Sequence, residues 1–250
     1  MKCSIVIPSF NSQEFIAYTI ESVLFQKYRN IELIIVDGGS RDDTIKIIKS
    51  YGQKITKFIS EPDRGVFDAL NKGIKIASGD VIGWLGSDDF YIDDSVVDIA
   101  MKTIVNKNVE MCWGDLIYVD RKNPNRIVRF WKSSEYKEGK FKKGWQLPHF
   151  ASFIKKDVLE KYGGFNLDFP IAADYELMLR LLEKHKVKSY YIPKALVKMR
   201  TGGQSNKNIT NIIKANIECY QAWRTNGLEI NPLIFFLKPA SKVIQYFKKP

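Results

Sequence analysis

Two adjacent carboxylates, Asp88 and Asp89, stand directly after an apolar run that ends at Leu85. In an open sheet of parallel strands, the residues that bind ligands lie at the carboxyl ends of the strands. A carboxylate pair at such an end has the oxygen ligands that Mg²⁺ or Mn²⁺ prefers, with phosphate oxygens completing the coordination. Most adjacent aspartates are solvated turns or helix caps, so the surrounding residues must decide between these roles.

Polar residues also follow the three apolar runs that precede this pair. Ser9 and Asn11 come after the first run, Asp37 after the second and Asp63 after the third. Because the carboxyl ends of parallel strands meet at one edge of a sheet, we expect these side chains to line one crevice with the aspartate pair. So many acids would repel an anionic ligand unless a divalent cation lay among them.

Strand and helix patterns alternate through the first half of the chain, where near-continuous apolar runs predict strands. The predicted strands are 3–10, 31–37, 54–60 and 80–86, with helices between them. Apolar residues on both faces of each strand are typical of a parallel sheet that is covered on both sides. The sequence therefore predicts a doubly wound α/β unit.

The second half is predicted to elaborate the same domain, because no linker-like stretch interrupts it. The predicted elements are a hairpin of 110–120 and 125–132, helices at 156–162, 172–185 and 207–225, and a strand at 189–193. Asp174 begins the second of these helices, where an acid also serves as an ordinary N-terminal cap.

The chain carries 39 basic and 28 acidic residues, a net charge of +11. Such a charge attracts phosphates of any kind, but no motif typical of RNA or DNA binding is present, so no nucleic-acid partner is expected. Three widely spaced cysteines predict neither a zinc site nor a disulfide framework. The chain also lacks the glycine-rich loops and the nucleophile elbow of dehydrogenases, NTPases and serine hydrolases.

Neither a signal peptide nor a membrane span is predicted, so we expect the protein in the cytoplasm or at the inner face of the cell membrane. The last stretch, 231–250, mixes large apolar residues with four lysines. This pattern fits a segment that lies on an anionic membrane surface, and equally a helix that packs back on the domain.

A resemblance to a known family is carried by three stretches in order: SIVIPSFNSQEFIAYTIESVLFQKYRNIELIIVDGGSRDDT, then EPDRGVFDALNKGIKIASGDVIGWLGSDD, then AADYELMLRLL. Together they strongly resemble family-2 glycosyltransferases, and within that family bacterial O-antigen and capsule enzymes. The resemblance implies a GT-A fold, which is α/β and Rossmann-like, with a mixed, mostly parallel central sheet and helices on both faces. It covers 1–205, with 1–106 binding the nucleotide sugar and 107–205 on the acceptor side, and leaves 206–250 as a helical, basic extension.

The resemblance implies an inverting transfer of a hexosyl or N-acetylhexosaminyl group from a nucleotide-diphosphate sugar, expected to be a UDP-sugar. The acceptor would be a glycan or a lipid-linked oligosaccharide in the synthesis of bacterial surface polysaccharide. By position, Asp174 would be the general base, Asp89 with Asp88 would bind Mn²⁺ or Mg²⁺, and the nucleotide would contact Pro8, Ser9, Asn11, Asp37, Gly39, Asp63, Arg64 and Asp88. The acceptor or the diphosphate would lie near His149, Trp145, Arg200 and Ser205.

The sequence departs from the family pattern in two places. Gly86 stands where the family has an acid two residues before the aspartate pair, and Gly202 and Gly203 stand where a histidine is frequent. These departures keep open a second function, that of a degenerate member that binds a nucleotide or a partner without catalysis. His149 has two open roles as well, because a lone histidine in an aromatic stretch is either structural or faces the acceptor.

Overall fold

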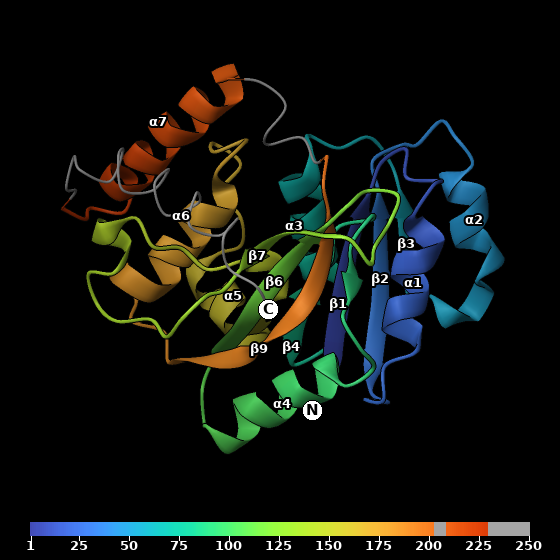
Figure 1. Ribbon diagram of the computed structural model, residues 1–250, viewed down its shortest axis with the longest axis horizontal. Coiled ribbons are helices and arrows are strands. Elements are labelled where there is room, and N and C mark those ends of the chain that lie inside the picture. The colour runs from blue at the N-terminus through green and yellow to red at the C-terminus, as the bar shows by residue number, and fades with distance from the viewer. Residues whose placement is uncertain (203–208, 230–250) are drawn as a thin grey trace.

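A single mixed β-sheet runs through the computed structural model, which describes residues 1–202 and 209–229 (Figure 1). Its first four strands are β1 (Cys3–Ser9), β2 (Ile31–Asp37), β3 (Lys57–Ser60) and β4 (Val81–Trp84). β1 lies between β2 and β4, β3 flanks β2, and all four strands are parallel. Their carboxyl ends therefore share one edge of the sheet, which confirms the arrangement expected from the apolar runs.

The sheet continues through the second half of the chain. β8 (Ser152–Lys155) lies between β4 and β6 (Met111–Val119) and is antiparallel to both. β9 (Ser189–Arg200) then runs parallel to β6, and its far end pairs with the short β5 (Phe90–Tyr91). β7 (Ile127–Trp131) pairs with β6 as the predicted hairpin. The fold is thus the expected mixed sheet, which curls as β9 crosses from β6 to β5.

Three strands, β5, β8 and β9, differ from the sequence-based prediction. β5 was not predicted, because two residues carry no periodic pattern. β8 was not predicted, because its four residues follow directly on an aromatic turn and carry no turn residue to mark a boundary. β9 was predicted to stop at Pro193 but continues to Arg200. The pairing between β6 and β9 shifts register beside this proline, between Trp113 and Asp115. Proline is tolerated where strand pairing is irregular, because its missing N–H breaks no regular ladder there.

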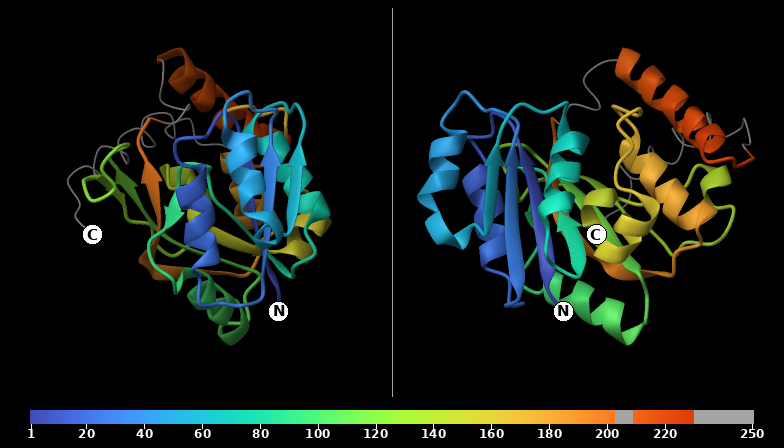
Figure 2. Two further views of the ribbon diagram at one scale, coloured as in Figure 1. Left: turned by 90° about the vertical axis from the view of Figure 1, so that its right-hand side faces the viewer. Right: turned by 180° about the vertical axis from the view of Figure 1, so that it is seen from behind.

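Helices cover both faces of the sheet, as expected (Figure 2). Neighbouring residues of β1 point to opposite faces, so Val6 enters one core cluster while Ile5 and Ile7 enter the other. α1 (Ile16–Leu24), α2 (Thr44–Ser50) and α4 (Val96–Asn106) pack in the second cluster. The first cluster takes α3 (Val66–Ile76), α5 (Lys156–Tyr162), α6 (Ala173–Leu179) and α7 (Ile209–Thr225).

Short helical segments connect these elements. They are 3-10 turns at Gly52–Lys54, Phe141–Lys143 and His149–Ala151, and a π-helical segment at Arg180–Lys184 that extends α6. α7, expected in an extension beyond the domain, lies beside α6 and buries Cys219, Ala222 and Trp223 in the shared core (Figure 1). Within 1–202 and 209–229, no helix combines the length and apolarity needed to cross a membrane.

Candidate functional site

The loops after β1, β2 and β3 are tied together by one buried carboxylate. Asp37 ends β2 and is fully buried. Its oxygens accept hydrogen bonds from Ser9 Oγ at 3.1 Å, Ser60 Oγ at 2.9 Å, and the backbone N–H groups of Gly39 at 3.1 Å and Ser40 at 2.9 Å. Asp37, which sequence reasoning placed against the nucleotide, therefore also fixes three strand ends relative to one another.

Asp63 presents its carboxylate at the same strand ends and is half-buried. It lies against Gly38, where an added Cβ would come within 2.5 Å of Asp63 Oδ2. Its other oxygen accepts the Gly65 N–H at 2.8 Å. The neighbouring guanidinium of Arg64 is exposed. Gly38 thus leaves room for an acid from the loop after β3 to stand beside the end of β2.

The first loop adopts a conformation that favours asparagine. Asn11 has a positive φ of 46°, which asparagine tolerates better than most residues. Its N–H donates to Ser40 Oγ at 2.8 Å, and its Oδ1 accepts the Arg41 N–H at 2.9 Å. A contact of 2.6 Å between the hydroxyls of Ser12 and Ser87 then joins this loop to the end of β4. The strand ends are therefore linked from β3 across to β4, with Pro8 buried beneath them.

The aspartate pair divides into a buried and a half-buried carboxylate. Asp89 is only 2% exposed, and its Oδ1 accepts the Arg200 N–H at 3.2 Å. Burial, and then the charge of Asp88, hold the pKa of Asp89 well above its usual range, while Arg200 opposes them. A Cβ added at Gly86 would come within 2.6 Å of Asp89 Oδ2. The glycine that replaces the family's acid therefore provides the space in which this carboxylate lies.

This pair fits a divalent cation. Two neighbouring carboxylates, one of them desolvated, repel each other when both are ionised, and a cation between them would remove that cost. The described parts of the chain hold no cluster of three or more acidic, histidine or cysteine side chains that would bind a metal unaided. A cation held by Asp88 and Asp89 would therefore take further ligands from a phosphate, as magnesium usually does.

Two guanidinium groups lie next to the pair, and sequence reasoning identified only Arg200. Arg121 lies on the turn between β6 and β7 and donates from Nη1 to Asp88 Oδ2 at 3.3 Å. It was missed because a basic hairpin turn is usually solvated, and only the pairing of β6 with β9 brings this turn to the aspartates. Ser205, also expected near the diphosphate, lies outside the described residues.

Asp174 and His149 lie close together and form a second pair of candidate residues. Asp174 is in the first turn of α6, and its Oδ2 lies 3.1 Å from His149 Nδ1. The backbone oxygen of His149 accepts the Trp84 Nε1–H at 2.6 Å, and its ring contacts Phe150 with centroids 4.0 Å apart. His149 Nε2 is buried without a hydrogen-bond partner among residues 1–202 and 209–229. The histidine is thus packed against the end of β4 and also touches the expected base.

The pKa of Tyr118 responds to the charges of both Asp89 and Asp174. Burial raises the pKa of Tyr118, the charge of Arg129 opposes this effect, and the charges of Asp89 and Asp174 both raise it further. A hydroxyl on β6 is therefore within electrostatic reach of both the expected metal ligand and the expected base. An alternating strand pattern gave no reason to select this tyrosine from the sequence.

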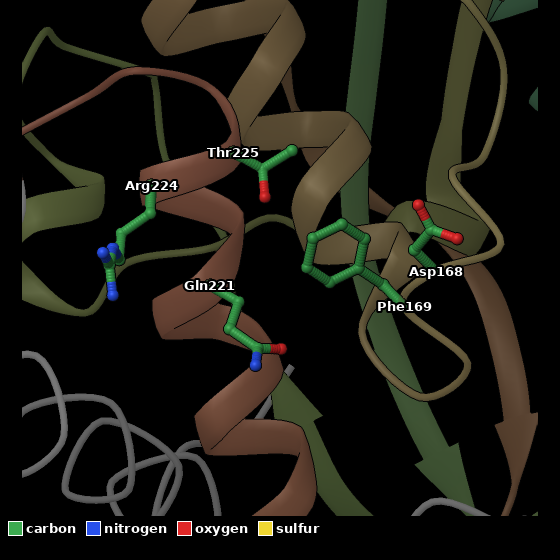
Figure 3. A pocket seen from close by; sticks show the side chains of 5 residues that line it. All are labelled: Asp168, Phe169, Gln221, Arg224 and Thr225. Carbon is green, nitrogen blue, oxygen red and sulfur yellow. The ribbon is translucent and has the colours of Figure 1, made fainter.

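Trp145 lies inside an aromatic cluster. Its ring packs edge-on against Trp113 and Phe141, with centroids 5.9 Å and 5.2 Å away, and its Nε1–H donates to Ser134 Oγ at 3.0 Å. An open pocket of about 340 Å³ lies elsewhere, between the loop before α6 and the last turns of α7 (Figure 3). Its lining residues all lie outside the predicted site: Asp168, Phe169, Gln221, Arg224 and Thr225.

Comparisons with known proteins bear on the family and the fold. The family model of glycosyl transferase family 2 matches residues 4–163. An uncharacterized glycosyltransferase of Mycobacterium tuberculosis is 38% identical over 184 residues, which cover 71% of this chain and 67% of the relative.

Solved structures show the same fold at low sequence identity. S. aureus TarS 1–349, in complex with UDP-GlcNAc, has a TM-score of 0.70 at 16% identity over 99% of this chain and 73% of TarS. The mannosyltransferase PcManGT from Pyrobaculum calidifontis, in complex with GDP-Man and Mn²⁺, has a TM-score of 0.65 at 16% identity, covering 97% and 69% of the two chains. With its GT-A architecture, its strand-end acids and the match over most of its length, this chain belongs to glycosyl transferase family 2.

Proposed function

We propose that this glycosyltransferase is a metal-dependent, inverting enzyme that transfers a sugar from a UDP-sugar to a hydroxyl of a glycan or lipid-linked acceptor in bacterial surface polysaccharide synthesis. The observation that carries the proposal is the pair of carboxylates, Asp88 and Asp89, that follows β4, together with Asp174, whose charge acts on the same tyrosine, Tyr118, as that of Asp89. The TarS structure, solved with UDP-GlcNAc, supports the donor class, and PcManGT, solved with GDP-Man and Mn²⁺, supports the metal.

The nucleotide would bind across the ends of β1 and β2. Ser9, Asn11 and Asp63 offer hydrogen-bonding groups there, and Arg64 adds a positive charge at the rim. Asp37 would also contact the nucleotide, and because it accepts several hydrogen bonds from the protein it keeps these loops in place. Loops fixed before the ligand arrives lose less entropy on binding, which strengthens binding.

The diphosphate would lie beside the aspartate pair. Asp88 and Asp89 would hold Mn²⁺ or Mg²⁺, and a bound cation stabilises the charge that develops on the leaving diphosphate. Arg200 adds a guanidinium that is packed over the rings of Phe15, Tyr18 and Phe90. Charged groups that are already in position stabilise developing charge without reorganising during the reaction.

The acceptor hydroxyl would be activated by Asp174. As its oxygen attacks the anomeric carbon, its proton passes to the carboxylate, and the bond to the diphosphate breaks with its electron pair leaving on the phosphate oxygen. Attack opposite the leaving group inverts the anomeric carbon. His149 Nδ1 lies 3.1 Å from Asp174 Oδ2, so the proton would be taken by the other oxygen.

The tail at 231–250 lies outside the described residues. We propose that it binds an anionic membrane surface, because it combines large apolar residues with four lysines and the acceptor is expected to be lipid-linked. The second candidate function, a degenerate member without catalysis, rested on Gly86. The contact between the Gly86 position and Asp89 favours the enzyme instead, because it gives the glycine a packing role.

Thermal unfolding of the full chain with UDP and with GDP, each with and without Mn²⁺, tests the donor and metal assignments. A ligand at about 100 times its Kd stabilises the folded state by about 2.7 kcal/mol. For a chain of this size, Tm rises by roughly 2–4 °C per kcal/mol. We expect a rise with UDP that requires Mn²⁺. No rise with either nucleotide would contradict the proposal and favour the degenerate alternative.

A further inference from the structure

Arg121 is held at the aspartate pair by contacts that leave it available to other partners. Its Nη1 lies 3.3 Å from Asp88 Oδ2, its Nη2 lies 3.6 Å from Glu14 Oε2, and its guanidinium stacks 4.7 Å from the centre of the Phe15 ring. Close charge-assisted hydrogen bonds are usually about 2.7–2.9 Å long, so neither ion pair is tight. The Arg121 side chain is also 43% exposed, and exposed pairs of this kind are weak.

Arg200 lies beside Arg121 but is fixed. Its guanidinium stacks 4.4 Å from the same Phe15 ring, and its Nη1 donates to the backbone oxygen of Arg121 at 2.8 Å. Arg200 is 6% exposed, and its Nε has no hydrogen-bond partner in the described part of the chain. One guanidinium of the pair is therefore immobilised by packing, while the other sits on a turn at the surface.

The net charge around the aspartate pair would change sign if a divalent cation bound there. The carboxylates of Glu14 and Asp88 lie beside the Arg121 guanidinium, and Asp89 accepts the backbone N–H of Arg200. The site therefore gathers three carboxylates and the two guanidiniums of Arg121 and Arg200. With all of these groups ionised the net charge is minus one, and a divalent cation would make it plus one. Asp88 would then bind the cation in place of Arg121, and Arg121 would lie within an excess of positive charge that attracts a diphosphate.

We propose that Arg121 exchanges partners during donor binding: it pairs with Asp88 in the metal-free protein and with the donor's diphosphate once a cation occupies the aspartate pair. This inference rests on the proposed function, since it assumes a nucleotide-diphosphate donor. The planar guanidinium is suited to two phosphate oxygens at once, and the aromatic ring of Phe15 supports it in either position. The β6–β7 turn thereby contributes to donor binding.

Binding of UDP to the full chain in Mn²⁺, measured by calorimetry for wild type, Arg121→Ala and Arg121→Lys, tests the exchange. We expect Arg121→Ala to weaken UDP binding by about 10- to 100-fold, the range of a hydrogen bond between charged groups. Arg121→Lys should lose less, because it keeps the charge but not the planar fork. Uridine, which has no phosphate, should bind all three proteins equally.

The affinity for Mn²⁺ without nucleotide should change in the opposite direction to the affinity for UDP. Arg121→Ala removes a cation that competes for Asp88, so we expect it to bind Mn²⁺ more tightly than wild type, as measured by paramagnetic resonance of free Mn²⁺. A variant that is merely misfolded would weaken both ligands. Arg126→Ala is the matched control, because Arg126 is on the same turn, is 74% exposed and pairs only loosely with Asp120 at 3.8 Å. It should leave both affinities unchanged.

The outcomes separate this inference from the proposed function. If wild type binds UDP and Arg121→Ala binds it equally or better, the exchange is wrong and the donor assignment stands. If Arg121→Ala binds Mn²⁺ equally or less tightly, Arg121 does not compete for Asp88 and the exchange is also wrong. If wild type binds neither UDP nor GDP, the proposed function fails and the exchange fails with it.

Discussion

Single carboxylates in this protein differ in what surrounds them, and the surroundings set their roles. Asp37 is fully buried and its oxygens are occupied by four neighbours. Asp89 is equally buried but has fewer donors and a raised pKa, which burial and the charge of Asp88 cause. Asp174 is half-buried and lies 3.1 Å from His149 Nδ1. Aspartates at three places in the chain are therefore suited to different roles: a structural one for Asp37, and the proposed metal binding and proton transfer for Asp89 and Asp174.

Replacing Asp174 with asparagine tests the base. The amide keeps the shape of the side chain but does not accept the proton, so we expect transfer to fall by about 10²- to 10⁴-fold. UDP binding should stay unchanged, because Asp174 is proposed to act on the acceptor and not on the nucleotide. Turnover of the donor in the presence of the acceptor, measured beside UDP affinity, checks this. Near-normal turnover would show that another group takes the proton.

His149 is expected to position Asp174 through its Nδ1–H. His149→Asn places an amide N–H close to the position of Nδ1 and should keep most of the transfer rate, whereas His149→Leu removes the donor. We expect the leucine variant to lose kcat by about tenfold, the value of roughly one hydrogen bond to a charged group, with little change in donor KM. Equal loss in both variants would mean that the ring serves packing against Phe150 and not the carboxylate.

At the scale of elements, an acid on β2 joins the strands at the opposite end of the sheet. Glu32 is almost fully buried and accepts hydrogen bonds from Ser4 of β1 and from Ser78, which precedes β4. Lys57 of β3 lies 3.0 Å away. Burial raises the pKa of Glu32, but these hydrogen bonds outweigh it and lower the pKa to about 2. The carboxylate is therefore stabilised in its ionised form by the folded state.

Glu32 should make stability depend on acid pH. Its pKa is lower in the folded protein, so its contribution is complete above about pH 4.5 and is lost as the pH falls towards 2. The contribution is on the order of 3 kcal/mol. The free energy of unfolding, measured with denaturant at several pH values in this range, should depend less steeply on pH for Glu32→Gln than for wild type. Glu160→Gln, at an exposed site on α5, is the control, and an unchanged slope in Glu32→Gln would contradict the assignment.

The elements also show why the sequence predicted part of the molecule and not the rest. The parallel strands were predictable because each is a continuous apolar run closed by a turn, and their common edge then placed Asp37 and Asp89 together. β8 was missed because four residues carry too little pattern. Arg121 was missed because its position depends on pairing between β6 and β9, which are distant in the sequence. Local sequence patterns predict strands and motifs, whereas contacts between strands that are distant in the sequence are seen only in the structure.

At the scale of the whole molecule, removal of the tail tests the proposed membrane contact. Each lysine near an anionic surface contributes about 1 kcal/mol to binding, so the full chain should sediment with anionic vesicles and release them at high salt. A chain of residues 1–230 should sediment much less, and neither should bind uncharged vesicles. If the two chains sedimented equally, membrane binding would come from residues 1–230, and the role proposed for the tail would be wrong.

The attachment of α7 to α6 has a consequence for which elements recombination between related proteins would exchange. Glu218 of α7 accepts the N–H groups of Ile171 and Ala172 at 2.9 Å and 2.7 Å, and Trp223 donates to Tyr175 at 2.9 Å. Asp174 stands between these anchor points, yet the family match ends at residue 163. Recombination at that boundary would exchange α6, β9 and α7 together, and with them both the proposed base Asp174 and Arg200, whose N–H donates to Asp89. Such hybrids would keep the aspartate pair of one parent and take Asp174 and Arg200 from the other.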